Sequence, residues 1–269
     1  MSKTEKLLKR LDEIGKMLER KGGAEMLLGL GSVGMETGRL DDYSDLDFFV
    51  IVKPGNKERF IRQLDWLEEV HPLAYSFQNT KDGCKILFAD GIYGEYAIFE
   101  ERELENCHYA EGRVVWKDPS YTRADLAKPS QPAPRLREDS LDHPLNEALT
   151  NLYVGLGRYA RGEKLTATRF VQSYAVDSIL SVLHLIETEE DYFPDAFGLE
   201  RRLEKRYPRF AGILGEMIQG YDRVPESALF ILQYIESIYP VNQRLAREIR
   251  ELADICQQNT RNSQENQTD

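Results

Sequence analysis

Residues that commonly bind metals or form disulfides are few and scattered in this chain of 269 residues. It has three cysteines, at positions 84, 107 and 256, with no CxxC spacing, which argues against a disulfide framework or a structural zinc site. The four histidines, at positions 71, 108, 143 and 184, are equally dispersed and form no HExxH motif. The spacing of these residues therefore indicates neither a disulfide framework nor a zinc motif.

Long apolar runs and an excess of positive charge are also lacking. No uncharged apolar stretch approaches the roughly 18 residues of a membrane-spanning helix. The N-terminal segment has no apolar signal core, so we expect a cytoplasmic protein without a membrane partner. The chain has 46 acidic and 35 basic residues, a formal charge of −11, which disfavours nucleic acid as a partner. An anionic substrate would need a metal ion or backbone amides to bind.

The hydrophobic pattern predicts an α+β fold, with a mixed-sheet domain followed by a helical bundle. In the first half, helical spacing of apolar residues predicts helices over 3–21 and 57–70, and short apolar runs predict strands over 26–30, 46–52, 73–78, 84–89 and 92–99. In the second half the spacing is helical throughout. It predicts helices over 144–159, 170–186, 197–207, 209–219, 225–238 and 241–256.

Composition sets the expected domain boundaries. Residues 1–120 form the first domain. Four prolines among polar residues mark 121–138 and the positions just before it as a linker. Residues 139–256 form the helical bundle, and the polar stretch 257–269 is expected to be a disordered tail.

The most informative segment lies between two predicted strands. The first strand ends in Gly31-Ser32, a loop of twelve residues follows, and the next strand begins Asp45-Leu46-Asp47. Because strand side chains alternate, Asp45 and Asp47 are expected on one face. Two carboxylates on one face favour a divalent cation with oxygen ligands, most simply Mg²⁺. Gly31 allows close approach of a phosphate, Ser32 can donate to it, and Ser44 is a further candidate for orienting the nucleotide.

Together these residues indicate metal-assisted nucleotidyl transfer, in which Mg²⁺ on Asp45 and Asp47 orients a triphosphate for in-line attack. Alone, an Asp-x-Asp pair is more often a solvated strand end than a catalytic site. The preceding strand, the Gly-Ser pair and the loop length favour the catalytic interpretation. Two cations near the site, Arg39 and Lys53, are interpreted as surface charges rather than phosphate ligands.

Gly31-Ser32 followed by Asp45-Leu46-Asp47 and an apolar strand resembles the signature of the DNA polymerase β-type nucleotidyltransferase superfamily. The likeness extends to the lincosamide nucleotidyltransferases, which adenylate antibiotics. It includes the stretches YSDLDFFVIVK (43–53), GEYAIFEERE (94–103) and RGE (161–163). The loop between Ser32 and Asp45 is longer than in close relatives, which bears on any triphosphate contacts made by that loop.

The resemblance implies a third catalytic carboxylate on a neighbouring strand, and the matching residue is Glu95. It would act as general base on the acceptor hydroxyl. The alternative is an exposed glutamate at a strand edge, and Asp90 is a rival carboxylate that fits better as a turn residue beside Gly91.

The function predicted by this resemblance is transfer of a nucleoside monophosphate, AMP from ATP, to a hydroxyl of a small molecule. The acceptor would be a lincosamide- or aminoglycoside-like antibiotic, bound on the side of the helical bundle, and the protein would be an antibiotic-resistance enzyme or a housekeeping relative. The resemblance also suggests a homodimer. The alternative is a regulatory protein of the toxin–antitoxin type that keeps this fold and modifies or binds a protein partner.

Overall fold

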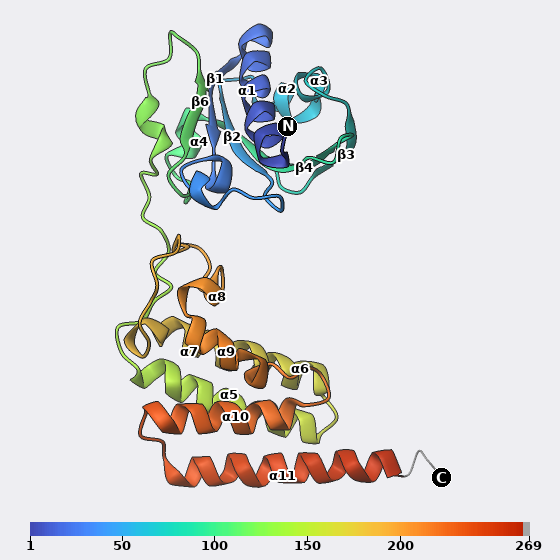
Figure 1. The fold of residues 1–269 in the computed structure, drawn as a ribbon, viewed down its shortest axis with the longest axis vertical. Coiled ribbons are helices and arrows are strands. Elements are labelled where there is room, and N and C mark those ends of the chain that lie inside the picture. Colours follow the sequence, from blue (N-terminus) through green and yellow to red (C-terminus); the bar gives the residue numbers. More distant parts are fainter. Residues whose placement is uncertain (266–269) are drawn as a thin grey trace. The chain divides into compact units, whose positions relative to one another are not determined.

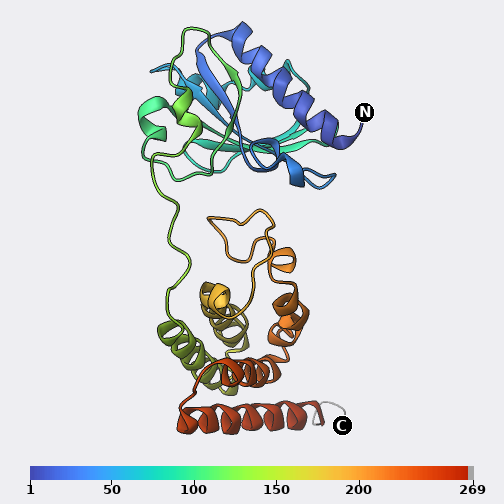
Figure 2. The same cartoon turned by 60° about the vertical axis from the view of Figure 1, so that its left-hand side comes forward.

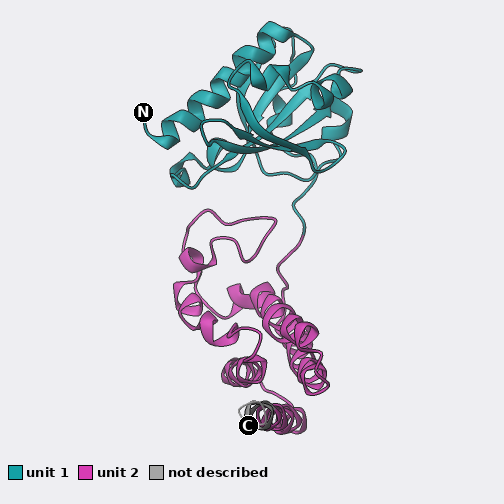
Figure 3. Cartoon of the chain, turned by 90° about the vertical axis from the view of Figure 1, so that its right-hand side faces the viewer, with its two compact units in different colours: residues 1–134 teal, residues 135–269 magenta. Residues whose placement is uncertain are grey.

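The computed structural model describes residues 1–265, with side chains described as far as residue 259. The chain divides into two compact units, residues 1–134 and 135–269 (Figure 3). The first unit contains a six-stranded mixed sheet and the second is helical (Figure 1), which confirms the predicted α+β class. The boundary between the units lies inside the segment 121–138 in which the sequence predicts a linker.

The sheet of the first unit has the strand order β3-β4-β5-β2-β1-β6. Its members are β1 (Ala24–Gly29), β2 (Leu46–Val52), β3 (Leu73–Gln78), β4 (Gly83–Phe88), β5 (Tyr93–Glu100) and β6 (Arg113–Lys117). The β2–β5 pair is parallel, and the other neighbouring strands are antiparallel. The central position of β2 and β5 follows from their apolar sequences, which are suited to burial on both faces.

The two faces of the sheet have separate apolar cores. Leu46, Phe48 and Val50 of β2 pack on one face with the first helix. Ile51, on the other face, packs against residues from the segment 99–126. Since that second core covers only the C-terminal part of β2, the N-terminal part of β2 and β5 is available for a site.

Helix α1 (Lys3–Lys21) lies across one face of the sheet (Figure 2). The Ser2 hydroxyl accepts from the backbone N–H of Glu5, and the Glu5 carboxylate accepts from the N–H of Ser2, a capping box that defines where the helix begins. Leu7, Leu11 and Leu18 are completely buried. The predicted helix 3–21 is thereby confirmed.

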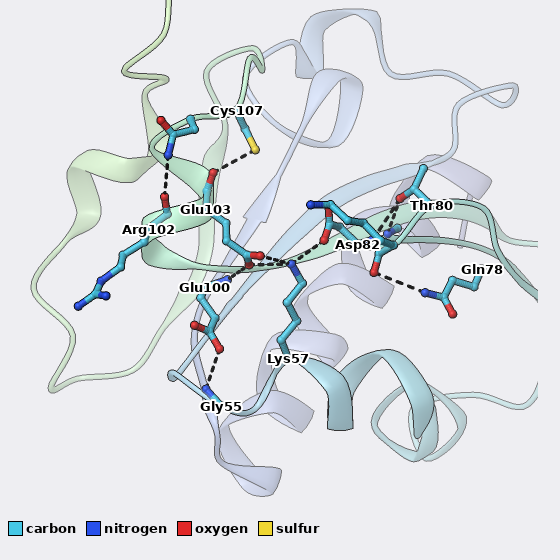
Figure 4. Close-up of polar contacts among 12 residues, drawn as sticks. Gly55, Lys57, Gln78, Thr80, Asp82, Glu100, Arg102, Glu103 and Cys107 are labelled. Atoms are coloured by element: carbon cyan, nitrogen blue, oxygen red, sulfur yellow. Dashed lines mark hydrogen bonds and ion pairs between the residues drawn. The ribbon is translucent and has the colours of Figure 1, made fainter.

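A cluster of charged groups joins α2 (Lys57–Arg62) to both ends of the β4–β5 hairpin (Figure 4). Lys57 lies 2.6 Å from a carboxylate oxygen of Asp82, before β4, and donates at 2.6 Å to Glu103 of α4 (Glu101–Leu104). Glu100, at the end of β5, accepts the N–H of Gly55 at 2.7 Å. These contacts fix the C-terminal end of β5 next to the β2–α2 connection.

The second unit packs its helices around a core of its own. The helices are α5 (Asp142–Ala160), α6 (Lys164–Thr168), a π-helical segment (Arg169–Tyr174), α7 (Ala175–Val182), α8 (Leu203–Arg206), α9 (Pro208–Met217), α10 (Val224–Ile238) and α11 (Gln243–Glu265). Leu152, Ile179, Ile231 and Ile249 are among its completely buried residues. None of the helices within residues 1–265 combines the length and apolar content needed to cross a bilayer.

Several elements differ from the prediction. Strand β6 was not predicted, and the helix expected over 57–70 is interrupted between α2 and α3 (Asp65–Glu68). The helix expected over 197–207 is reduced to α8, because Arg202 has the left-handed φ of 58° and stops the helix on its N-terminal side. The disordered tail was expected from residue 257, but α11 continues to Glu265, and residues 266–269 lie outside the described part of the chain.

Candidate functional site

Asp47 and Glu95 lie side by side on β2 and β5, the parallel strand pair of this sheet. Asp47 of β2 is in register with Glu95 of β5, so their side chains leave the same face of the sheet. Adjacent strands are about 4.8 Å apart, which makes the two carboxylates lateral neighbours. The strand order thus brings together two acidic residues that are far apart in the sequence.

Asp45 lies one residue before β2, at the point where the loop enters the strand. Burial raises the pKa of its carboxyl above the usual range, and the negative charge of Glu95 raises it further. The positive charge of Arg39 acts in the opposite direction. The ionisation of Asp45 therefore responds to the charges of both Glu95 and Arg39.

The loop after β1 brings backbone against these carboxylates. Gly31 has a φ of +51°, in the left-handed region, and its carbonyl accepts the N–H groups of Gly34 and Glu36, both at 3.0 Å. A Cβ on Gly31 would lie 2.9 Å from Nη2 of Arg39 and 3.7 Å from Oδ2 of Asp47. The guanidinium of Arg39 and the carboxylate of Asp47 thus both lie next to the position that a side chain on residue 31 would occupy.

Arg39 is less exposed than its interpretation as a solvated surface charge implies. It was interpreted as a surface charge, but its side chain is only 22% exposed, lies over Gly31 and forms an ion pair with Glu36. Lys53, at the other end of β2, is 3.5 Å from Asp118, away from the site. The position of Arg39 depends on how the loop folds back on Gly31, and no periodicity in the sequence signals that.

The two candidate serines have different surroundings. Ser32 is buried, with 4% of its surface exposed. The hydroxyl of Ser44 donates to the carboxylate of Asp41 at 3.1 Å and accepts the N–H of Asp41 at 3.0 Å, so it stabilises the loop that leads into β2. A nucleotide contact by either hydroxyl stays a prediction.

Glu95 is held by two donors that the sequence analysis did not identify. One of its oxygens accepts from Lys85 of β4 at 2.9 Å and from the hydroxyl of Tyr93 at 2.8 Å. Burial raises the pKa of Glu95, but these two hydrogen bonds outweigh it and leave the pKa below its usual value. Glu95 is thus ionised at neutral pH. The Asp90-Gly91 turn signal implies the antiparallel pairing of Lys85 with Glu95 and was the available clue.

Asp90 is not part of this group. It lies in the β4–β5 turn, where Gly91 donates its N–H to Phe88 at 2.9 Å. Its carboxylate accepts from the buried guanidinium of Arg10 at 2.8 Å. This pairing gives Asp90 a structural role and supports its interpretation as a turn residue.

The donor set of the site suits a magnesium ion that shares its coordination with a substrate. The described residues contain no group of three or more His, Cys, Asp or Glu side chains placed to hold a metal by themselves. Mg²⁺ commonly binds through one or two carboxylates, with phosphate oxygens and water completing its shell. Asp45 and Asp47 could supply such a pair. A cation there would offset the cost of burying the ionised Asp45 carboxylate and its repulsion by Glu95, the two effects that raise the pKa of Asp45.

In the second unit, Glu163 of the RGE stretch pairs with Arg158 at 2.8 Å and lies 3.6 Å from Arg161. This is an ion-pair cluster at the end of α5. It fits the interpretation of these residues as ion pairs at a helix end.

Comparison with known proteins gives little further information. No family model and no curated protein sequence matches this chain. Among solved structures, it is weakly similar to an aminoglycoside 6-adenyltransferase from Bacillus subtilis, with 14% identity, a TM-score of 0.33 and 98% of each chain covered. We therefore infer function from the geometry of the site.

Proposed function

We propose that the protein is a magnesium-dependent nucleotidyltransferase that moves AMP from ATP to a hydroxyl of a small molecule. The observation that carries this proposal is the Asp47–Glu95 pair on parallel strands, with Asp45 beside it and Gly31 against it. Three carboxylates next to a turn at Gly31 suit a reaction in which a hydroxyl attacks a metal-bound triphosphate.

In this proposal each residue has a defined role. Asp45 and Asp47 bind Mg²⁺, which would neutralise charge on the α-phosphate. The Gly31 loop contacts the phosphates, and Arg39 is the cation that pairs with them. Arg39 already lies over Gly31, so it needs little reorganisation. Its pairing with Glu36 would be exchanged for phosphate oxygens.

Glu95 acts as the general base. Lys85 and Tyr93 keep it ionised, so it can accept the proton of the acceptor hydroxyl. The acceptor oxygen forms a bond to the α-phosphorus, the bond to the bridging oxygen breaks, and pyrophosphate leaves. Protonated Glu95 then releases its proton to solvent, since its side chain is 40% exposed.

The proposed acceptor is a lincosamide- or aminoglycoside-like antibiotic. The test is a mass-spectrometric transfer assay with Mg²⁺, each of the four common nucleoside triphosphates and a panel of both antibiotic classes. Asp47→Asn removes one carboxylate charge at constant shape. Asp42→Asn is the control for the loss of one negative charge, because Asp42 is exposed in the loop that leads into β2.

A product heavier by one nucleoside monophosphate, formed by the wild type and the control but not by Asp47→Asn, supports the proposal. If the wild type forms no such product with any compound, the proposed reaction and acceptor are wrong. Binding of Mg²⁺-ATP that requires Asp47 would then leave a regulatory, nucleotide-binding protein as the better description.

A further inference from the structure

A row of side chains continues from the carboxylates to the edge of the sheet. Asp47 is in register with Glu95, Glu95 with Lys85 of β4, and Lys85 with Phe77 of β3. Paired residues in a sheet project from the same face, so these four side chains share one face. The adjacent row consists of Tyr93, Leu87 and Tyr75.

The outer end of this surface is aromatic and exposed. Tyr75 and Phe77 are large aromatic residues on the edge strand β3. Tyr75 is 55% exposed and Phe77 is 51% exposed. An edge strand with exposed aromatic rings is an aggregation risk, and proteins usually protect such edges with charge or proline. Neither ring belongs to the apolar cores of this unit, so packing does not account for them.

The direction of the proposed reaction indicates what would cover these rings. In an in-line displacement, the attacking oxygen and the leaving pyrophosphate lie on opposite sides of phosphorus. The loop with Gly31 and Arg39 follows β1, and the strands then run β2, β5, β4, β3. With the triphosphate at the β1 side, the hydroxyl arrives at Glu95 of β5, and the rest of the acceptor extends over β4 and β3.

We infer that Tyr75 and Phe77 form the surface on which a ring of the acceptor rests while its hydroxyl lies at Glu95. This inference rests on the proposed function. Two strand spacings, about 10 Å, separate Glu95 from Phe77. A ring-bearing molecule can cover that distance, with Leu87 and the stem of Lys85 beneath it. The flat face of a sugar or amino-sugar ring suits contact with exposed aromatic rings, and a protonated amine would add a cation–π attraction.

Steady-state kinetics with the antibiotic panel tests the inference. Phe77→Ala and Tyr75→Ala are expected to raise the KM for the acceptor about tenfold, with the KM for ATP unchanged. Phe77→Trp should keep the acceptor KM near that of the wild type. Ser76→Ala is the matched control, since Ser76 is exposed on the same strand but projects from the opposite face.

Two results would overturn the inference. An unchanged acceptor KM in both alanine variants means that the rings do not contact the acceptor. A rise in the KM for ATP instead means that the nucleotide base rests there.

Calorimetric titration of the same compounds without nucleotide separates this inference from the proposed reaction. Binding that Phe77→Ala weakens, and that Asp47→Asn and Ser76→Ala leave intact, supports the aromatic surface even if no transfer is detected. Normal transfer by Phe77→Ala disproves the surface and leaves the reaction standing. If no compound binds the wild type, the assignment of the surface to a ring-bearing acceptor is wrong.

Discussion

Arg39 is the cation that the structure places over Gly31, next to Asp47. If it pairs with phosphate oxygens, Arg39→Gln should raise the KM for ATP about tenfold or more, since a charged hydrogen bond contributes about 1.5–3 kcal/mol. Arg62→Gln is a suitable control because that side chain is 75% exposed on α2. An unchanged KM for ATP in Arg39→Gln would remove Arg39 from the proposed nucleotide site.

The ionisation of Glu95 depends on Lys85 and Tyr93, and this gives a second prediction at the same scale. Their hydrogen bonds lower the pKa of Glu95 against the effect of burial, so Lys85→Met should raise it. Because a general base must be unprotonated, the acidic limb of kcat/KM should move to higher pH. Lys81→Met, at a side chain that is 86% exposed, should leave the pH profile unchanged. A profile that stays in place in Lys85→Met would argue against Glu95 as the base.

At the scale of elements, the Gly31 turn combines backbone strain with a close approach, and a second glycine separates the two effects. Gly31→Ala and Gly55→Ala both put a side chain at positive φ, which costs about 1–2 kcal/mol of unfolding free energy. Only at Gly31 would the new Cβ meet Arg39, because nothing lies within 4 Å of the corresponding position at Gly55. We expect similar losses in urea unfolding but loss of transfer in Gly31→Ala alone. Equal activity of both variants would contradict the placement of the triphosphate against Gly31.

The Lys57 cluster is an element-scale contact that holds β5 in place. Lys57 is 17% exposed and pairs with Asp82 and Glu103. Lys57→Met leaves two partly buried carboxylates without their shared cation and should lower the unfolding free energy by about 1–3 kcal/mol. Lys16→Met, at an exposed position on α1, should change it little. Urea titration followed by circular dichroism measures both, and equal stability of the two variants would show that the cluster does not stabilise the sheet.

The strands were predicted well where apolar sequence is dense. Residues 46–52 and 73–78 are strands β2 and β3 as expected. Strand β6 was missed because its five residues are all only partly buried, so they leave a weak pattern. Its existence depends on pairing with β1, which is a non-local interaction.

The candidate site was predictable only in part. Gly31, Asp45 and Asp47 belong to one strand–loop–strand segment, so their spacing was enough to make them candidates. Lys85 reaches Glu95 through strand pairing, and Arg39 reaches Gly31 through the folding of an irregular loop. Contacts of this kind depend on tertiary structure, and local pattern does not encode them.

At the scale of the whole molecule, each unit has its own apolar core, and every residue of the proposed site belongs to the first unit. Residues 1–134 expressed alone should therefore fold and bind Mg²⁺-ATP with a Kd close to that of the full chain. Titration calorimetry on the fragment and the full chain measures this. A fragment that folds but binds ATP more than tenfold more weakly would show that the second unit contributes to the nucleotide site.

The parallel pairing of β2 with β5 also has a consequence during synthesis of the chain. β1 and β2 can pair soon after they leave the ribosome, but β5 becomes available only after the β3–β4 hairpin has been made. Until then β2 presents an open edge with the sequence LDFFVIV, the kind of edge to which other chains add. The pairing that brings Glu95 to Asp47 thus also closes this open edge of the growing chain.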